Sequence, residues 1–167
     1  MKRMRAYLDA SAVGGPFDPE FAEPSRKLVA AILSGAVVPL ISETLAAEIA
    51  DAREEVQALL EQIMQARAER LSLSAEAIAL QAAYLAAGVV SARYADDAMH
   101  VAQATVARAD VVASWNFRHL VNPARVRAFN GVNLAHGYGM VVVLTPADVV
   151  KTLEAEDEQA DRSSEGL

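Results

Sequence analysis

The chain alternates between short apolar runs and longer segments in which apolar residues recur every three or four positions. The short runs are typical of buried strands, and they lie at 4–9, 36–41, 111–113 and 140–144. The second run contains Pro39. Because proline lacks a backbone N–H, this residue predicts an edge strand or the end of a strand.

The longer segments predict amphipathic helices, several of which begin at a serine that can cap the first turn. Helices are expected over 25–33, from Ser42 to Met64 with a charged break at 51–55, from Ser74 to Ala87, and from Ser91 to Ala107. The segment through 122–133 is expected to be mostly helical or irregular, and a short helix is expected to start at 145–148. Strands that alternate with helices predict a mainly parallel sheet covered on both faces. We therefore expect an α/β fold, in the form of a three-layer αβα sandwich.

Composition and charge exclude some kinds of site, but they do not indicate the class of substrate. The chain contains no cysteine, which excludes disulfides and thiolate metal ligands and fits a cytoplasmic protein. No apolar run approaches the roughly 20 residues of a membrane span. The net charge of −7 is concentrated in 154–167, which hold six acids and one base, and the rest of the chain has a net charge of −2. Charge therefore neither supports nor excludes a nucleic-acid substrate.

Asp9 is the first candidate for chemistry. It follows the first apolar run and precedes the small residues 10–12 and a Gly-Gly-Pro turn at 14–16. Ligands bind at the carboxyl ends of strands in open α/β sheets, so Asp9 could hold a ligand. Helix capping is an equally good interpretation, because aspartate is a common N-cap residue.

Two further acids lie on predicted helices. Glu48 has apolar or small neighbours, and an acid in such surroundings needs a partner or a metal ion. A solvent-facing glutamate on an amphipathic helix is the alternative, and it would be preferred if Asp9 were absent. Asp96 and Asp97 lie four and three residues before His100, so either pair could face one metal ion. A packed or hydrogen-bonded imidazole is the preferred interpretation of His100, since three scattered histidines form no zinc signature.

Weaker oxygen ligands follow the third apolar run. The hydroxyl of Ser114 and the carboxamide of Asn116 can bind a hard cation directly or through water. Asparagine is also an ordinary turn residue. Together with Asp9, Glu48 and Asp97, these side chains would gather oxygen ligands at one edge of the sheet.

This constellation resembles the PIN-domain ribonucleases, in particular the VapC-type toxins of bacterial toxin–antitoxin pairs. The residues that carry the resemblance are Tyr7-Leu8-Asp9-Ala10-Ser11, Ile41-Ser42 with Glu48-Ile49, Ala95–Ala102 and Ala109–Asn116. They stand in the family's order and span residues 4 to about 145. The resemblance implies one PIN-like domain over 1–152, and the acidic segment 153–167 is expected to be disordered.

The resemblance also implies a metal-dependent endoribonuclease. Asp9, Glu48 and Asp97 match the first three metal-site acids of the family, and the implied ion is Mg²⁺ or Mn²⁺. Asn116 stands where the family usually has a fourth acid, so a second ion would be held more weakly. Candidates for supporting roles are Ser11, Ser114, Asp96 and His100, and candidates for RNA contacts are Arg118, Arg125 and Arg127.

The partners that the resemblance implies are an RNA substrate, a small antitoxin protein and a second copy of the chain in a homodimer. Two alternatives stay open. A non-catalytic PIN-like module could bind RNA or protein, with Asn116 marking a loss of activity. A haloacid dehalogenase-type phosphohydrolase also begins with a strand-ending aspartate, but it needs a second aspartate where this chain has Ser11.

Overall fold

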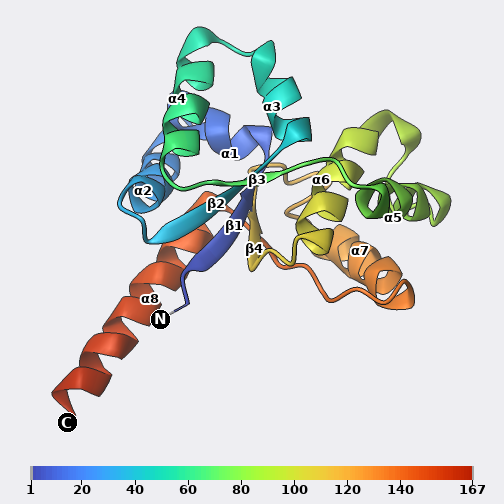
Figure 1. The fold of residues 1–167 in the computed structure, drawn as a ribbon. Coiled ribbons are helices and arrows are strands. Elements are labelled where there is room, and N and C mark those ends of the chain that lie inside the picture. The colour runs from blue at the N-terminus through green and yellow to red at the C-terminus, as the bar shows by residue number, and fades with distance from the viewer. Residues whose placement is uncertain (1, 167) are drawn as a thin grey trace.

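Five parallel strands form a central sheet in the order β3-β2-β1-β4-β5 (Figure 1). The structure is a computed structural model and describes residues 2–166. The strands are β1 (Met4–Leu8), β2 (Val37–Ser42), β3 (Glu69–Leu71), β4 (Val111–Ala113) and β5 (Val143–Leu144). β1 lies at the centre, where Ala6 pairs with Pro39 of β2 and with Val111 of β4.

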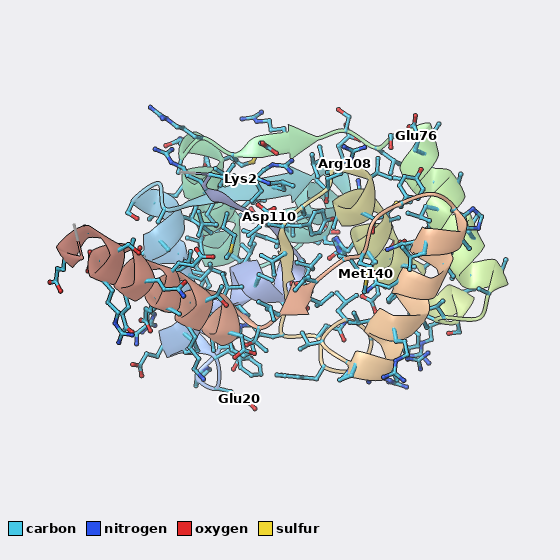
Figure 2. The ribbon with its side chains drawn as sticks, turned by 90° about the horizontal axis from the view of Figure 1, so that it is seen from below. Lys2, Glu20, Glu76, Arg108, Asp110 and Met140 are labelled. Carbon is cyan, nitrogen blue, oxygen red and sulfur yellow. The ribbon has the colours of Figure 1, made fainter. Side chains whose placement is uncertain are left out.

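Helices cover both faces of the sheet, which makes the three-layer αβα sandwich (Figure 1). One face carries α1 (Ala10–Gly14), α2 (Ala22–Leu33), α3 (Glu43–Ala50), α4 (Glu54–Gln65) and α8 (Pro146–Glu165). The other face carries α5 (Ala75–Ala86), α6 (Ala95–Val106) and α7 (Pro123–Ala135). Two short 3₁₀ turns, Gly15–Phe17 and Ala92–Tyr94, precede α2 and α6. Figure 2, seen from below, shows α8 and α7 on opposite sides of the sheet.

The alternation of side chains along β1 explains why there are two hydrophobic cores. Successive residues of a strand point to opposite faces. Ala6 and Leu8 therefore belong to the core under α2, α3 and α4, whereas Tyr7 belongs to the core under α5 and α6. All three side chains are buried. Asp9 therefore lies at the carboxyl edge of the sheet, directly after a strand whose last three side chains are fully packed.

The predicted α/β sandwich with a mainly parallel sheet is confirmed. The placement of Pro39 at an edge or a strand end is wrong, because Pro39 lies inside β2, which is bordered by β1 and β3. Two elements have no counterpart in the predicted pattern, α1 and β3. The last strand is shorter than predicted, since only Val143 and Leu144 pair with β4.

The acidic segment differs from its expected disorder. α8 begins at a Thr145 cap with Pro146 in its first turn and continues through the acidic residues to Glu165. Val149 is buried against the sheet, whereas the second half of the helix is exposed and extends away from the body (Figure 1). Alanine, glutamate and glutamine favour a helix even where packing is absent. None of the helices within residues 2–166 combines the length and apolarity needed to cross a membrane.

Candidate active site

The carboxyl ends of three neighbouring strands bring the candidate residues to one edge of the sheet. β1 ends at Asp9, β4 is followed by Ser114, and β2 leads through Ser42 into α3, which carries Glu48. Asp97 comes to this region from the first turn of α6. The short parallel strands therefore gather residues from four distant parts of the sequence.

Asp9 is the most buried of the acids, with 4% of its surface exposed. It caps α1, and its Oδ1 accepts hydrogen bonds from the N–H of Ala12 at 3.0 Å and from the hydroxyl of Ser11 at 2.7 Å. Its Oδ2 accepts a hydrogen bond from the hydroxyl of Ser114 at 2.5 Å. Burial raises the pKa of Asp9, although these hydrogen bonds and the nearby His100 oppose the rise. The capping interpretation is correct, and it leaves a carboxylate held between two serine hydroxyls.

The loop after β4 is tied to the Asp9 region by two serines. The Oγ of Ser11 accepts the N–H of Trp115 at 2.8 Å, and the Oγ of Ser114 accepts the N–H of Asn116 at 2.9 Å. The carboxamide oxygen of Asn116 accepts the N–H of His119 at 3.0 Å. In this conformation the amide of Asn116 therefore closes a turn, the ordinary role of asparagine that its position after the strand also suggested.

Glu48 is paired with a histidine across the sheet edge. Its Oε1 lies 2.7 Å from Nε2 of His100, whose Nδ1 lies 2.6 Å from the hydroxyl of Tyr7. Burial opposes protonation of His100, but the hydrogen bond and charge of Glu48, with the charges of Asp9 and Asp97, raise the pKa of this histidine. The preferred interpretation of His100 as a hydrogen-bonded imidazole agrees with this geometry.

Asp97 is paired with a second histidine. Its Oδ2 lies 2.9 Å from Nδ1 of His119, a buried residue in the loop after β4. The ring of Tyr94 packs on the His119 ring with 4.0 Å between centroids. The helical pairs that the sequence suggested, Asp96 or Asp97 with His100, are not formed, because each histidine binds an acid from another element.

The carboxylate oxygens at this edge suit Mg²⁺ or Mn²⁺, because both ions prefer oxygen ligands. The charges of Asp9, Glu48 and Asp97 all raise the pKa of His100, so the three acids lie in the neighbourhood of this imidazole. Among residues 2–166, no three acid or histidine side chains converge closely enough to hold an ion directly. Glu48 and Asp97 turn to their histidines instead. Sharing one ion would therefore use bridging waters or a rotation of these side chains.

The other candidate residues divide between the rim and the surrounding surface. Arg118 is exposed, and its guanidinium carbon lies 5.2 Å from the ring centre of Tyr94, beside His119. Arg125 is half-buried and donates a hydrogen bond to the carbonyl of Val89. Asp96 and Arg127 are exposed, and no hydrogen bond or ion pair within residues 2–166 connects either side chain to the three acids.

Three buried residues of this edge have no role in the sequence-based prediction: Tyr7, Ser42 as a partner of Tyr7, and His119 as a partner of Asp97. Tyr7 directly precedes Leu8-Asp9 in the motif that resembles the PIN family, and Ser42 begins the predicted helix. Both residues therefore lie in segments that the sequence analysis had already singled out. Only the tertiary structure shows that the two hydroxyls meet, at 2.7 Å.

Gly15 provides a test of how tightly the loop after β4 is packed. A Cβ at Gly15 would lie 2.2 Å from Oγ of Ser25 and 2.9 Å from Nε1 of Trp115, two atoms that share a hydrogen bond of 2.8 Å. We expect Gly15→Ala to lower the free energy of unfolding by about 1–3 kcal/mol through overpacking. Gly14→Ala is the matched control, because nothing lies within 4 Å of its Cβ position. Urea unfolding followed by Trp115 fluorescence measures both, and equal stability of the two variants would contradict this packing.

The parallel sheet with helices on both faces is consistent with a PIN-like three-layer α/β sandwich. The chain is similar to a solved structure described as "Crystal Structure of FitAcB from Neisseria gonorrhoeae", with a TM-score of 0.53 and 16% sequence identity over 84% of this chain and 97% of that chain. At this identity the similarity shows the fold alone. No protein-family model and no curated protein matches the sequence. Membership of the VapC type within this fold stays a prediction.

Proposed function

We propose that this protein is a metal-dependent endoribonuclease that hydrolyses RNA phosphodiester bonds. The observation that carries the proposal is the position of Asp9, Glu48 and Asp97 at the carboxyl edge of a parallel α/β sheet, after β1, on α3 and in the first turn of α6. Carboxylates gathered at a strand edge repel one another, and a divalent cation relieves that repulsion. Fold similarity and the family motifs support the reaction class.

Asp9, Glu48 and Asp97 would hold Mg²⁺ or Mn²⁺, with water completing the shell as is usual for Mg²⁺. A bound ion of this kind lowers the pKa of a coordinated water and offsets charge on the phosphate. The serine hydroxyls of Ser11 and Ser114 oppose the effect of burial on the pKa of Asp9 and so favour its charged form. The products implied by the family resemblance carry a 5′-phosphate and a 3′-hydroxyl.

The surface beside the acids suits single-stranded RNA. Phe117 is an exposed aromatic residue, 51% accessible, next to the stacked rings of Phe21 and Trp115. Arg118 and Arg93 are both exposed and both approach the ring of Tyr94. Aromatic faces stack on unpaired bases, and arginines contact phosphates. The loop 114–119 would therefore present RNA-binding groups next to the acids.

The direct test is an RNase assay on single-stranded RNA with purified full-length protein. We expect cleavage with Mg²⁺ or Mn²⁺, no cleavage with a chelator, and none by Asp97→Asn. Wild-type protein that binds RNA but cleaves none under any of these ion conditions would contradict the enzyme and favour the non-catalytic binding module.

The family resemblance also supports a small antitoxin partner, a homodimer and a cytoplasmic location as parts of this proposal. A small protein encoded directly upstream is the natural candidate for the antitoxin. Co-expression of the two should suppress the RNase activity and give a complex on gel filtration. Full RNase activity in the presence of that protein, with no complex, would contradict the toxin–antitoxin assignment.

Asn116→Asp should strengthen metal binding. An aspartate at 116 keeps an acceptor for the N–H of His119 and adds the negative charge of the family's fourth acid. Ligand charge tunes cation affinity, so we expect the half-saturating Mn²⁺ concentration in the RNase assay to fall by about tenfold. Asn122→Asp is the matched control, since Asn122 also closes a turn by accepting the N–H of Arg125. An unchanged or higher Mn²⁺ requirement in Asn116→Asp would argue against a ligand role for this position.

A further inference from the structure

We infer that His100 is a positioning residue. Its imidazole is hydrogen-bonded to Tyr7, which is hydrogen-bonded in turn to Ser42. The imidazole holds one oxygen of Glu48 and leaves the other oxygen to a divalent ion. The inference rests on the proposed function, because it assigns to Glu48 the role of a metal ligand. It adds to that function a set of buried residues that touch neither RNA nor the ion.

A continuous row of hydrogen bonds connects these groups across the core. Oγ of Ser42 lies 2.7 Å from the hydroxyl of Tyr7, which lies 2.6 Å from Nδ1 of His100, and Nε2 of His100 lies 2.7 Å from Oε1 of Glu48. The row begins at the end of β2, crosses the side chains of β1 and α6, and ends on α3. Four elements of the fold therefore determine where the carboxylate of Glu48 lies.

Burial changes sharply along this row. Ser42, Tyr7 and His100 are all 2% exposed or less, whereas 30% of the Glu48 side chain is accessible. Groups enclosed by packing have one orientation, and an accessible glutamate alone would sample several rotamers. The buried part can therefore impose its geometry on the accessible carboxylate. Within residues 2–166, no protein hydrogen bond reaches Oε2 of Glu48, so this oxygen is available.

The direction of the row follows from its two ends. A carboxylate only accepts hydrogen bonds, so Nε2 of His100 donates to Glu48. At the other end, Oγ of Ser42 accepts the N–H of Leu45 at 3.1 Å, which leaves its own proton for the oxygen of Tyr7. In the neutral ring that carries its proton on Nε2, Nδ1 is an acceptor, so the phenol of Tyr7 accepts from Ser42 and donates its own proton to Nδ1 of His100.

As placed, the side-chain oxygen of Gln103 accepts a hydrogen bond from the hydroxyl of Tyr7, and the reversed orientation of this amide would fit the direction above. The oxygen lies 3.3 Å from the hydroxyl of Tyr7, and among residues 2–166 the buried Nε2 of Gln103 lacks a hydrogen-bond partner. The oxygen and nitrogen ends of a carboxamide occupy nearly the same space, so the surrounding hydrogen bonds decide its orientation. A half-turn of the amide lets Nε2 donate to the oxygen of Tyr7, and the proton of Tyr7 is then reserved for His100. A hydrogen bond donated by Nε2 of Gln103 to the oxygen of Tyr7 polarises the phenol and so strengthens the other hydrogen bonds of the row.

The consequence for metal binding can be measured without following RNA cleavage. Outer residues that orient a metal ligand typically change metal affinity by about 10–100-fold when they are lost. Isothermal titration of the full-length protein with Mn²⁺ gives that affinity directly. His136, which is exposed on the C-terminal side of α7, is the control histidine.

We expect His100→Ala to weaken Mn²⁺ binding by about 10–100-fold, and His136→Ala to leave it unchanged. In His100→Gln, the side-chain N–H₂ can donate from the place of Nε2, so the affinity should stay within a few-fold of wild type. Tyr7→Phe keeps the imidazole but removes its fixed partner, and it should weaken Mn²⁺ binding by a smaller factor. Thermal unfolding of each metal-free variant verifies that it folds.

Nitrogen NMR of the histidine rings gives a readout that needs no metal. In the wild type, at a pH high enough to make the ring neutral, His100 should carry its proton on Nε2, and Tyr7→Phe should shift the Nδ1 resonance of this ring alone. A neutral ring in the wild type with its proton on Nδ1 and none on Nε2 would overturn the inference. So would equal Mn²⁺ affinity in His100→Ala and wild type, or equal losses in His100→Ala and His100→Gln. Absence of Mn²⁺ binding by the wild type would instead defeat the proposed metal site and this inference with it.

Discussion

Replacing Asp9 with asparagine should reduce RNA cleavage by about 10³-fold or more, because a metal ligand supplies several kcal/mol of transition-state stabilisation. The fold should survive. The side chain caps α1 through Oδ1, which accepts from Ala12 and Ser11, and an asparagine oxygen can keep both bonds. The hydroxyl of Ser114, which donates to Oδ2, would turn to accept from the new amide N–H₂. Burial disfavours the charged form of Asp9, as its raised pKa shows. The neutral amide therefore should leave the melting temperature of the metal-free protein unchanged or raise it.

Single-turnover cleavage of a labelled RNA measures this effect, with circular dichroism to follow the fold. Asp18→Asn is a suitable control, because Asp18 is an exposed acid whose Oδ1 also caps a local turn by accepting the N–H of Glu20. It should cleave RNA at the wild-type rate. Undiminished cleavage by Asp9→Asn would remove Asp9 from the active site.

Ser114→Ala is expected to have the second largest effect, a loss of about 10–100-fold in cleavage at neutral pH, the usual range for a group that orients a metal ligand. The hydroxyl donates to Oδ2 of Asp9 and opposes the effect of burial on the pKa of that acid. Without the hydroxyl the pKa of Asp9 rises further, so Asp9 ionises only at higher pH. The acidic limb of the pH–rate profile should therefore move to higher pH, and part of the lost rate should return as the pH increases.

Rates of RNA cleavage measured across a pH series separate this effect from simple unfolding. Ser34→Ala serves as the control, because Ser34 is exposed and its hydroxyl donates to the carbonyl of Ala31 on the far side of α2. A Ser114→Ala profile that keeps the wild-type shape, or moves to lower pH, would contradict the role assigned to this hydroxyl.

Local patterns in the sequence were sufficient to predict the strand ends that form the site. The apolar run before Asp9 and the β-branched run before Ser114 both became buried parallel strands of the central sheet. Parallel strands place their carboxyl ends at one edge, so the proximity of Asp9 and Ser114 followed from the pattern. The serine cap at Ser42 likewise predicted the start of the helix that carries Glu48.

The two elements that the sequence did not predict, α1 and β3, have weak or conflicting local sequence patterns. β3 has only three residues, two of them charged, and Glu69 gains its place through an ion pair with Arg5 of β1 at 2.6 Å. α1 is a five-residue helix that ends among glycines, and its composition is that of a turn. In both cases, contacts with the rest of the fold decide the structure, and propensity has little influence.

The pairing of Glu48 and Asp97 with histidines also could not be predicted from the sequence. Glu48 and His100 are 52 residues apart, and Asp97 and His119 are 22 apart. The spacing of Asp97 and His100 on one helix allowed a local pair facing one metal ion. The structure instead joins each acid to a histidine of another element, because the sheet edge brings α3, α6 and the loop after β4 together.

The central claim is that Asp9, Glu48 and Asp97 share a divalent ion, and Mn²⁺ binding to four versions of the full-length protein tests it most directly. Electron paramagnetic resonance counts the free Mn²⁺ left in solution with the wild type, Asp9→Asn, Glu48→Gln and Asp97→Asn. The account predicts a saturable site in the wild type and an affinity at least about tenfold weaker in each variant, since each loses one charged ligand. Wild-type affinity in all three variants, or no saturable binding in the wild type, would contradict it.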